Sequence, residues 1–163
     1  MAGDMFLKIE GIDGESTDEA HSNWIEIESW NVNFSQNVSG KAKSTGGGRT
    51  AERVDISDLV ITKVMDKSTP EIKFACATGK HIPTVQIEIC RASEKKEKYY
   101  EIKMTDVLIS NVSSAHSTGS IPMETVSFNP GSIEWTYTEM SHGPGKPGGP
   151  IKHNWDMLKN KGG

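Results

Sequence analysis

The sequence contains only two cysteines, and no hydrophobic run approaches the roughly 20 residues that a membrane helix needs. Two cysteines in a chain of this length do not make a disulfide framework, so we expect Cys76 and Cys90 to be reduced. The N-terminus has neither a basic leader nor a long apolar stretch, which argues against a cleavable signal peptide. These absences predict a protein that is assembled in the cytoplasm and is not inserted into a membrane.

An excess of basic residues is also absent. The chain has 18 Lys and Arg against 22 Asp and Glu, whereas domains dedicated to nucleic acid usually carry a basic excess on one face. Its 163 residues suit a single domain, covering 1–163. The 34% hydrophobic residues, 25% charged residues and 16 glycines are typical of a turn-rich β protein. We therefore expect one β domain that does not bind nucleic acid.

Charge is unevenly distributed along the chain. Residues 1–30 contain eight acids against one base, Lys8, whereas residues 140–163 contain four lysines against one acid, Asp156. Solvated turns and chain ends explain this pattern, and so does attraction between the opposite ends of two copies. The sequence leaves both interpretations open.

Motifs for catalysis or for a bound cofactor are missing. The five histidines lack the spacing of a zinc site, and no Gly-x-Ser-x-Gly segment is present. The glycine-rich segment 44–50 lacks the Gly-Lys-Ser/Thr of a phosphate loop and leads into a strand-like pattern, and the acidic segment 13–19 lacks the alternating ligands of a calcium loop. We expect no enzyme, no metal and no cofactor, and only a pair of carboxylates brought together by folding is left open as a catalytic arrangement.

Apolar and polar residues alternate along most of the chain, which is the pattern of half-buried strands. Val85, Ile87 and Ile89 share one face of such a run. A charged turn at 94–98 leads into a second run that sets Tyr100, Ile102, Met104 and Leu108 on one face. We expect these two runs to pair as an antiparallel hairpin.

The alternation shifts by one residue at several places. One shift lies near Glu28 to Trp30, another between Val54 to Ile56 and Leu59 to Ile61, and a third at Asn129-Pro130-Gly131, which we expect to interrupt its strand. Such shifts suit strands that curve between two sheets. The prediction is a mainly β fold, a two-sheet β-barrel or sandwich with one short flanking α-helix at about residues 69–79. The run Leu59 to Met65 is apolar on both faces, so the helix or a neighbouring subunit should cover it.

Residues 68–79 carry the signals of that helix. Either Ser68 and Glu71 form a capping box, or Thr69 caps the helix with Pro70 at its first position. Gly79 supplies the C-terminal stop. The face that packs on the sheet is expected to contain Ile72, Ala75 and Cys76.

Several of these segments together resemble a known family. They are Asp4-Met5-Phe6-Leu7-Lys8-Ile9, Gly14-Glu15-Ser16, His21, the strand from Trp24 to Trp30, Asp66-Lys67-Ser68-Thr69-Pro70, Cys76, Gly79-Lys80-His81, and Gly148-Gly149-Pro150-Ile151-Lys152 with Trp155. In combination they resemble the Hcp proteins of bacterial type VI secretion systems, from end to end of the chain.

The resemblance implies a fold and a function. The family fold is a β-barrel of two packed sheets with one helix on its flank, and six copies form a ring whose open centre can hold effector proteins. Rings stack into a tube inside a contractile sheath, with spike and baseplate proteins as further partners, and the tube is secreted. Some family members carry a toxin domain after the tube module, and we expect no such extension in a chain that ends eight residues after Trp155.

The resemblance also implies candidate contact residues. The family strand that contributes to the ring interior corresponds to Ser29–Asn33, which makes Trp30, Asn31 and Asn33 candidates for the lumen, although a solvated role for the two asparagines remains an equal alternative. The family loop that reaches the next ring corresponds to residues 41–53. Its candidates for stacking contacts are Lys41, Lys43, Arg49, Glu52 and Arg53.

Two other classes of protein stay open. A β-sandwich module that binds carbohydrate or peptide would expose aromatic side chains such as Trp24 or Trp135 in a groove. A hydrolase would need convergent acids or a serine and histidine pair. A native mass of six chains would favour the ring over both.

Overall fold

The computed structural model describes residues 3–39, 50–94, 96–139 and 149–163, and in these ranges the chain is mainly β, as predicted. There are eleven strands and one helix. In chain order they are β1 (Gly3–Ile9), β2 (Ile25–Glu26), β3 (Ser29–Asn31), β4 (Phe34–Ser39), β5 (Thr50–Ile56), β6 (Leu59–Val64), α1 (Thr69–Thr78), β7 (Ile82–Arg91), β8 (Lys98–Ala115), β9 (Met123–Tyr137), β10 (Ile151–Asp156) and β11 (Lys161–Gly162).

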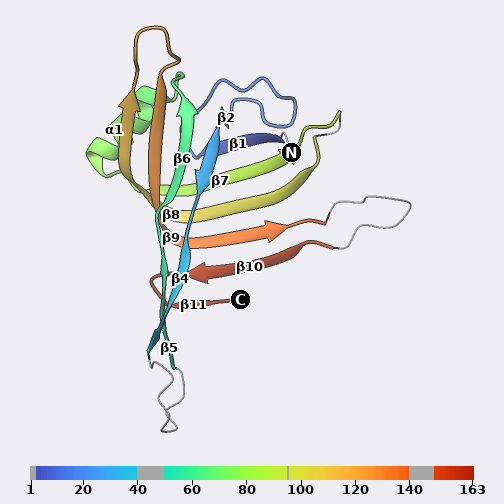
Figure 1. Cartoon of the computed structure of the whole chain (residues 1–163), viewed down its shortest axis with the longest axis vertical. Coiled ribbons are helices and arrows are strands. Elements are labelled where there is room, and N and C mark those ends of the chain that lie inside the picture. Colours follow the sequence, from blue (N-terminus) through green and yellow to red (C-terminus); the bar gives the residue numbers. More distant parts are fainter. Residues whose placement is uncertain (1–2, 40–49, 95, 140–148) are drawn as a thin grey trace.

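Nine strands form one bent sheet, and β4 and β5 form a separate two-stranded ribbon. The long strands β8 and β9 pair along most of their length and join the two halves of the bent sheet. The first half has the order β11-β10-β9-β8-β7-β1-β2, and in the second half β6 pairs with both β9 and β3. Figure 1 shows β8 and β9 turning together out of the first half and ending beside α1. The predicted hairpin of β7 and β8 is confirmed.

The sheet bends at the same place in three neighbouring strands, β7, β8 and β9. Asp106 lies between the pairs that β8 makes with β7 and β9, opposite Pro83 and Gly131, and its φ of 50° is in the left-handed region. A Cβ at Gly131 would lie 3.0 Å from the Cβ of Asp106, so glycine permits this close approach. The buried residues of β8 are even-numbered before this point and odd-numbered after it. Val107 is therefore buried, whereas Leu108 was the residue expected on the buried face. The predicted shift at Asn129-Pro130-Gly131 is real, but β9 continues through it and is not interrupted.

The predicted bend near Glu28 is also confirmed. The Ile27 amide donates to the Met5 carbonyl of β1 at 3.1 Å, and the next amide, that of Glu28, donates to the Thr62 carbonyl of β6 at 2.8 Å. One short stretch of chain therefore passes from the first half of the sheet to the second. In the described part of the chain the strand ladder does not close into a barrel, and this stretch holds the two halves face to face over a common core.

The core contains aliphatic residues from both halves and from the helix. Its fully buried members include Leu7, Ile25, Leu59, Ile61, Ile72, Val85, Ile87, Ile102, Met104, Val107, Val126 and Phe128. Two charged side chains, Lys63 and Glu124, are buried at its edge. Burial of this apolar surface is the main favourable term for folding.

The helix begins and ends where the sequence predicts, but neither predicted N-terminal cap forms. The side chain of Ser68, the residue before α1, makes no capping bond. Both its amide and its hydroxyl donate instead to Asp66 Oδ1. Thr69 is already helical, and its hydroxyl accepts the Asp66 amide at 3.1 Å. Gly79 ends the helix in the left-handed conformation with φ of 64°, as expected.

The helix packs on the sheet through the predicted face. Ile72 and Ala75 are buried, and Cys76 is half-buried against the core. Phe74, on the outer face, is 66% exposed. The helix lies against β8 in the second half of the sheet (Figure 1), and its buried face joins the core. That the helix or a neighbouring subunit covers the outer face of β6 stays a prediction.

Candidate assembly surface

The three lumen candidates lie in β3 and just after it, and they do not all face the same way. Trp30 is half-buried and stacks on Tyr100 with ring centroids 5.7 Å apart, so it packs on the protein's own core. Asn31 and Asn33 lie on the opposite face and are exposed. The backbone of Asn33 is fixed by Ser57, whose hydroxyl accepts its amide at 2.8 Å. The two asparagines are therefore available to a neighbouring molecule, whereas Trp30 supports the strand from within.

The ribbon of β4 and β5 extends away from the bent sheet (Figure 1). Its register pairs Phe34 with Ile56 and Ser39 with Thr50, with an irregularity between Gln36 and Val38. Neither strand pairs with any other described strand. A two-stranded ribbon is marginally stable by itself in water, so its position favours a contact with another molecule.

Only part of the predicted stacking segment can be located. Lys41, Lys43 and Arg49 lie outside the described residues, and Glu52 and Arg53 belong to β5. The Arg53 guanidinium donates through Nη2 to the carbonyl of Met157, in the turn after β10. Arg53 therefore ties the base of the ribbon to the C-terminal hairpin.

The inner face of the first half of the sheet becomes progressively uncovered toward β10. One row of directly opposed residues runs across β7, β8, β9 and β10, formed by Ile89, Tyr100, Tyr137 and Ile151. Ile89 is 6% exposed, whereas Tyr137 is 47% and Ile151 is 66% exposed. Phe34, at the base of the ribbon, is 44% exposed and contacts Trp135 edge-on at 5.1 Å, two residues along β9 from Tyr137. We call Phe34, Tyr137 and Ile151 the apolar strip.

Acidic and basic side chains gather on two different parts of the molecule. The loop between β1 and β2 and the last residue of β2 carry exposed Asp13, Glu15, Glu19 and Glu26. The C-terminal hairpin carries the exposed lysines 152, 159 and 161. In Figure 1 this loop lies above β1, and the hairpin lies below β9, beside the ribbon. The geometry thus keeps both interpretations of the charge pattern, with complementary surfaces available to two copies.

A metal site or a reactive cysteine would be a further functional feature of the described residues. Among residues 3–39, 50–94, 96–139 and 149–163 there is no group of three His, Cys, Asp or Glu side chains that could hold a metal ion. Burial raises the pKa of the Cys90 thiol to about 11, which suits a packing role. Within the same ranges, no helix is long and apolar enough to cross a membrane.

Two clusters of buried polar residues were not predicted from the sequence. His21 is buried between Asp18 and Glu88, and Lys63 is buried against Glu124. A signal existed for the second cluster, because Lys63 continues the buried alternation of Leu59 and Ile61. For His21 no local pattern pointed to a partner 67 residues away.

The comparisons with known proteins agree over almost the whole chain. Residues 6–137 match the family model described as "Type VI secretion system effector, Hcp". The chain is 37% identical to Protein hcp1 of Pseudomonas aeruginosa over 162 residues, which cover 98% of each chain. It belongs to the Hcp family.

Solved structures support this membership. This Hcp chain is similar to a structure described as that of a type six secretion system protein, with a TM-score of 0.89, 30% identity and coverage of 99% of this chain and 100% of the other. It is similar to Hcp1 from Salmonella typhimurium, with a TM-score of 0.82, 32% identity and coverage of 99% of both chains. The chain is therefore a type VI secretion protein with the β-rich Hcp fold.

Proposed function

We propose that this Hcp chain is a structural subunit of the inner tube of a type VI secretion system. Six copies close into a ring, rings stack into a tube, and effector proteins are carried in the open centre. The chain is assembled in the cytoplasm and then exported. Sheath, spike and baseplate proteins are its further partners. The observation that carries this proposal is the apolar strip, which the chain's own described elements leave uncovered beside an unpaired ribbon.

The strip and the ribbon suit contacts between copies. A head-to-tail contact joins two different surfaces, and it gives a ring when the rotation between copies closes. Exposed apolar side chains beside open strand edges favour burial against another subunit. We assign the strip and the base of the ribbon to the contact within the ring.

The two charged surfaces suit a different contact. Solvated ion pairs contribute little each and are screened by salt, so stacking through the acidic loop and the basic hairpin should weaken as salt is added. The ring, held by apolar burial, should resist salt. Light scattering across a salt series tests this difference, and a ring that dissociates before the stacks would contradict it.

The exposed asparagines are proposed for the lumen. Asn31 and Asn33 present amides that can donate and accept, which suits varied cargo surfaces better than a fixed charge. If Asn31 and Asn33 contact cargo, replacing both by serine should reduce the amount of effector retained. If both are only solvated, the replacement should leave effector retention unchanged. Co-purification of an effector with wild type and double variant distinguishes the two.

Native mass spectrometry tests the ring directly. Wild type should give one species at six times 17.8 kDa. Ile151→Glu puts a charge in the apolar strip and should give monomers that keep the wild-type circular dichroism spectrum. Leu158→Glu is the matched control, because Leu158 is 77% exposed and lies outside the strip, in the turn after β10. A monomeric wild type, or a ring that survives Ile151→Glu, would overturn the assignment of the strip.

The carbohydrate- or peptide-binding alternative finds no support in the aromatic side chains. Trp135 is covered by Phe34, and Trp24 meets the His21 ring edge-on at 4.8 Å. Neither tryptophan forms an open platform on which a sugar ring could stack.

A further inference from the structure

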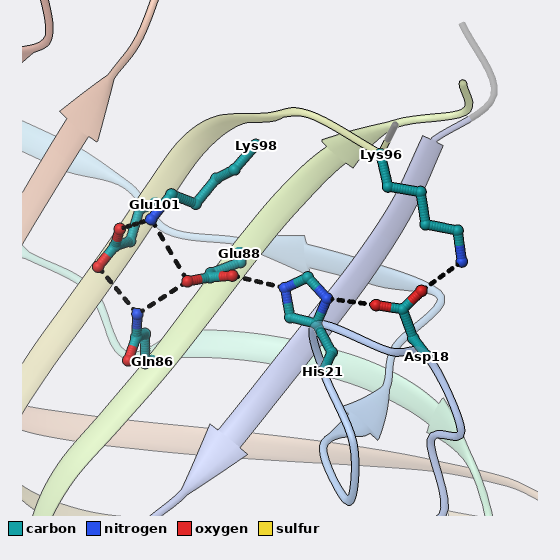
Figure 2. A network of polar contacts seen from close by, with 7 residues as sticks. All are labelled: Asp18, His21, Gln86, Glu88, Lys96, Lys98 and Glu101. Atoms are coloured by element: carbon teal, nitrogen blue, oxygen red, sulfur yellow. Dashed lines mark hydrogen bonds and ion pairs between the residues drawn. The ribbon is translucent and has the colours of Figure 1, made fainter. Parts of the chain in front are cut away.

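The His21 imidazole is enclosed between two carboxylates (Figure 2). Its Nδ1 lies 2.7 Å from Asp18 Oδ2, and its Nε2 lies 2.5 Å from Glu88 Oε2. The residue is only 4% exposed. Ionised carboxylates can only accept, so both contacts are hydrogen bonds only when both ring nitrogens carry a proton. A neutral imidazole would leave one carboxylate facing a nitrogen lone pair at hydrogen-bond distance.

The first carboxylate is held in its ionised form chiefly by Lys96. Lys96 Nζ lies 2.6 Å from Asp18 Oδ1 and 3.5 Å from Asp4 Oδ2. The hydrogen bonds from Lys96 and His21 lower the pKa of the Asp18 carboxyl from 3.8 to about 2. Asp18 is therefore an anion throughout the neutral range.

The second carboxylate lies in a ladder of polar contacts on the outer face of β7 and β8. Glu88 Oε1 accepts from Gln86 Nε2 at 3.1 Å and lies 3.4 Å from Lys98 Nζ. Lys98 Nζ also lies 2.5 Å from Glu101 Oε2. The other oxygen of that carboxylate, Glu101 Oε1, accepts from Gln86 Nε2, which therefore donates to both glutamates. This ladder fixes Glu88 on the strand while its Oε2 points at His21 (Figure 2).

The other groups around the imidazole are aromatic. The ring of Phe6, on β1, is stacked on it at 4.1 Å and is nearly parallel, and Trp24 meets it edge-on. Lys8 Nζ lies 5.8 Å from the Trp24 ring centroid, on the far side of that contact. His21 therefore joins the loop between β1 and β2, residues 10–24, to β1 and β7, and its partner Asp18 joins the same loop to Lys96 in the turn before β8.

We propose that His21 is a protonation-dependent clasp that ties the loop 10–24 to β7 as an imidazolium and releases that loop when its proton is lost. The loop has its own backbone bonds, such as Gly14 amide to Asn23 carbonyl at 2.8 Å and Ser16 amide to Trp24 carbonyl at 3.0 Å. These amides report whether the loop is closed. The clasp acts within one chain, so its test does not depend on whether rings form.

The neighbouring groups keep their charge states while the histidine changes. Imidazole is the side chain that ordinarily titrates between pH 5 and 8. Burial raises the pKa of Cys90 to about 11, and carboxylate partners raise the pKa of Lys96 and of Lys98, against the lowering effect of burial. Cys90, Lys96 and Lys98 therefore do not account for a change in the loop between pH 6 and pH 9.

Hydrogen exchange of backbone amides at pH 6 and pH 9, corrected for the intrinsic exchange rate, tests the clasp. In wild type, the amides of residues 10–24 should exchange about tenfold faster at pH 9 after correction, because one charge-assisted hydrogen bond is lost. The amides of β7 and β8 should not change. His21→Gln should leave the loop equally open at both pH values. His81→Gln is the control, since His81 is an exposed histidine 3.1 Å from a single carboxylate, that of Asp106, and should behave as wild type.

Glu88→Gln separates a protonation effect from simple packing. Its side-chain amide can donate to a neutral Nε2 while Nδ1 donates to Asp18, so this variant should keep the loop closed at pH 9. Nitrogen-15 spectra of the wild-type imidazole at pH 6 should show both ring nitrogens protonated. The proposal is overturned if wild-type exchange is independent of pH, if Glu88→Gln opens at pH 9 like wild type, or if the spectra show a neutral tautomer at pH 6.

Discussion

The buried pair of Lys63 and Glu124 offers a sharp test of the packing described above. The two residues are directly opposed on β6 and β9, and both side chains are 0% exposed. Lys63 Nζ lies 2.5 Å from Glu124 Oε1 and 3.0 Å from Asp66 Oδ1, and the Thr69 hydroxyl donates to the same glutamate oxygen at 2.8 Å. The pair thus joins two strands to the first turn of α1. We consider its replacement by Lys63→Met and Glu124→Leu, separately and together.

Lys63→Met leaves the buried Glu124 carboxylate without its cation, and Glu124→Leu leaves the buried Lys63 ammonium with Asp66 as its remaining carboxylate. Such a loss is expected to destabilise a protein by about 3–5 kcal/mol, a large part of the roughly 5–15 kcal/mol that holds a typical domain folded. For a chain of this length the midpoint of thermal unfolding should fall by about 10 °C. In Lys63→Met the remaining carboxylate is Glu124, whose Oε2 already has no hydrogen-bond partner among the described residues.

The double replacement removes both charges and keeps a similar side-chain volume. Exchanging a buried ion pair for apolar residues is often neutral or stabilising, because the desolvation of both charges is also avoided. The Thr69 hydroxyl loses an acceptor, at about 1 kcal/mol, and the Asp66 carboxylate, which is partly exposed, loses its ion pair with Lys63. The double variant should therefore lie within about 1 kcal/mol of wild type.

Urea unfolding followed by circular dichroism, at one protein concentration for all variants, measures the coupling. The exposed pair of Lys152 and Glu134, 3.2 Å apart, provides a matched cycle, and each of its truncations should cost less than about 1 kcal/mol. If the double variant at 63 and 124 were destabilised by the sum of its singles, the two charges would be acting independently. That result would refute the reasoning.

Two further predictions follow from the geometry. Gly131→Ala places a Cβ 3.0 Å from Asp106 at the sheet bend and should destabilise the protein by about 1–3 kcal/mol, whereas Gly149→Ala, with no atom within 4 Å of the new Cβ, should stay within about 0.5 kcal/mol in the same urea assay. The pKa of Asp18 is lowered, chiefly by Lys96, so its contribution to stability is present above about pH 4 and is lost as the pH falls toward 2. Asp18→Asn should therefore lose less stability than wild type between pH 4 and pH 2, and parallel melting-temperature curves would contradict this.

The curvature of the sheet could be predicted because burial leaves a period-two pattern in each strand. Where the pattern shifts, as between Ile27 and Trp30, the chain must turn its other face inward, and the structure shows it changing partner strands there. The shift at Asp106 was not predicted, and Leu108 was therefore wrongly expected on the buried face in place of Val107. The sequence gives no sign of a left-handed aspartate in mid-strand, since that conformation depends on the close approach of β9.

The helix cap shows why local motifs fail. Ser68 and Glu71 have the spacing of a capping box, yet Asp66 takes both Ser68 donors. Aspartate two residues before serine competes for the same amide, and which acceptor prevails depends on how the buried Lys63, near the end of β6, holds Asp66 in the turn that follows. The candidate contact residues were harder still, since they came from family resemblance and three of the stacking candidates lie outside the described residues.

The register of β6 shows what the buried ion pair adds beyond stability. Residues 59–64 are apolar on both faces, with Leu59 and Ile61 buried and Val60 and Val64 half-buried, so hydrophobicity alone distinguishes poorly between the native pairing and a one-residue slip. A slip would turn Lys63 to the outer face and leave Glu124 buried without its cation. The pair therefore disfavours the wrong register by about 3–5 kcal/mol, which is also the free energy of unfolding that each single variant is expected to lose. In the apolar double variant this penalty disappears, so the amide resonances of β6 should split or broaden although the free energy of unfolding is preserved. A single sharp set of resonances would show that β3 and β9 specify the register without the charges.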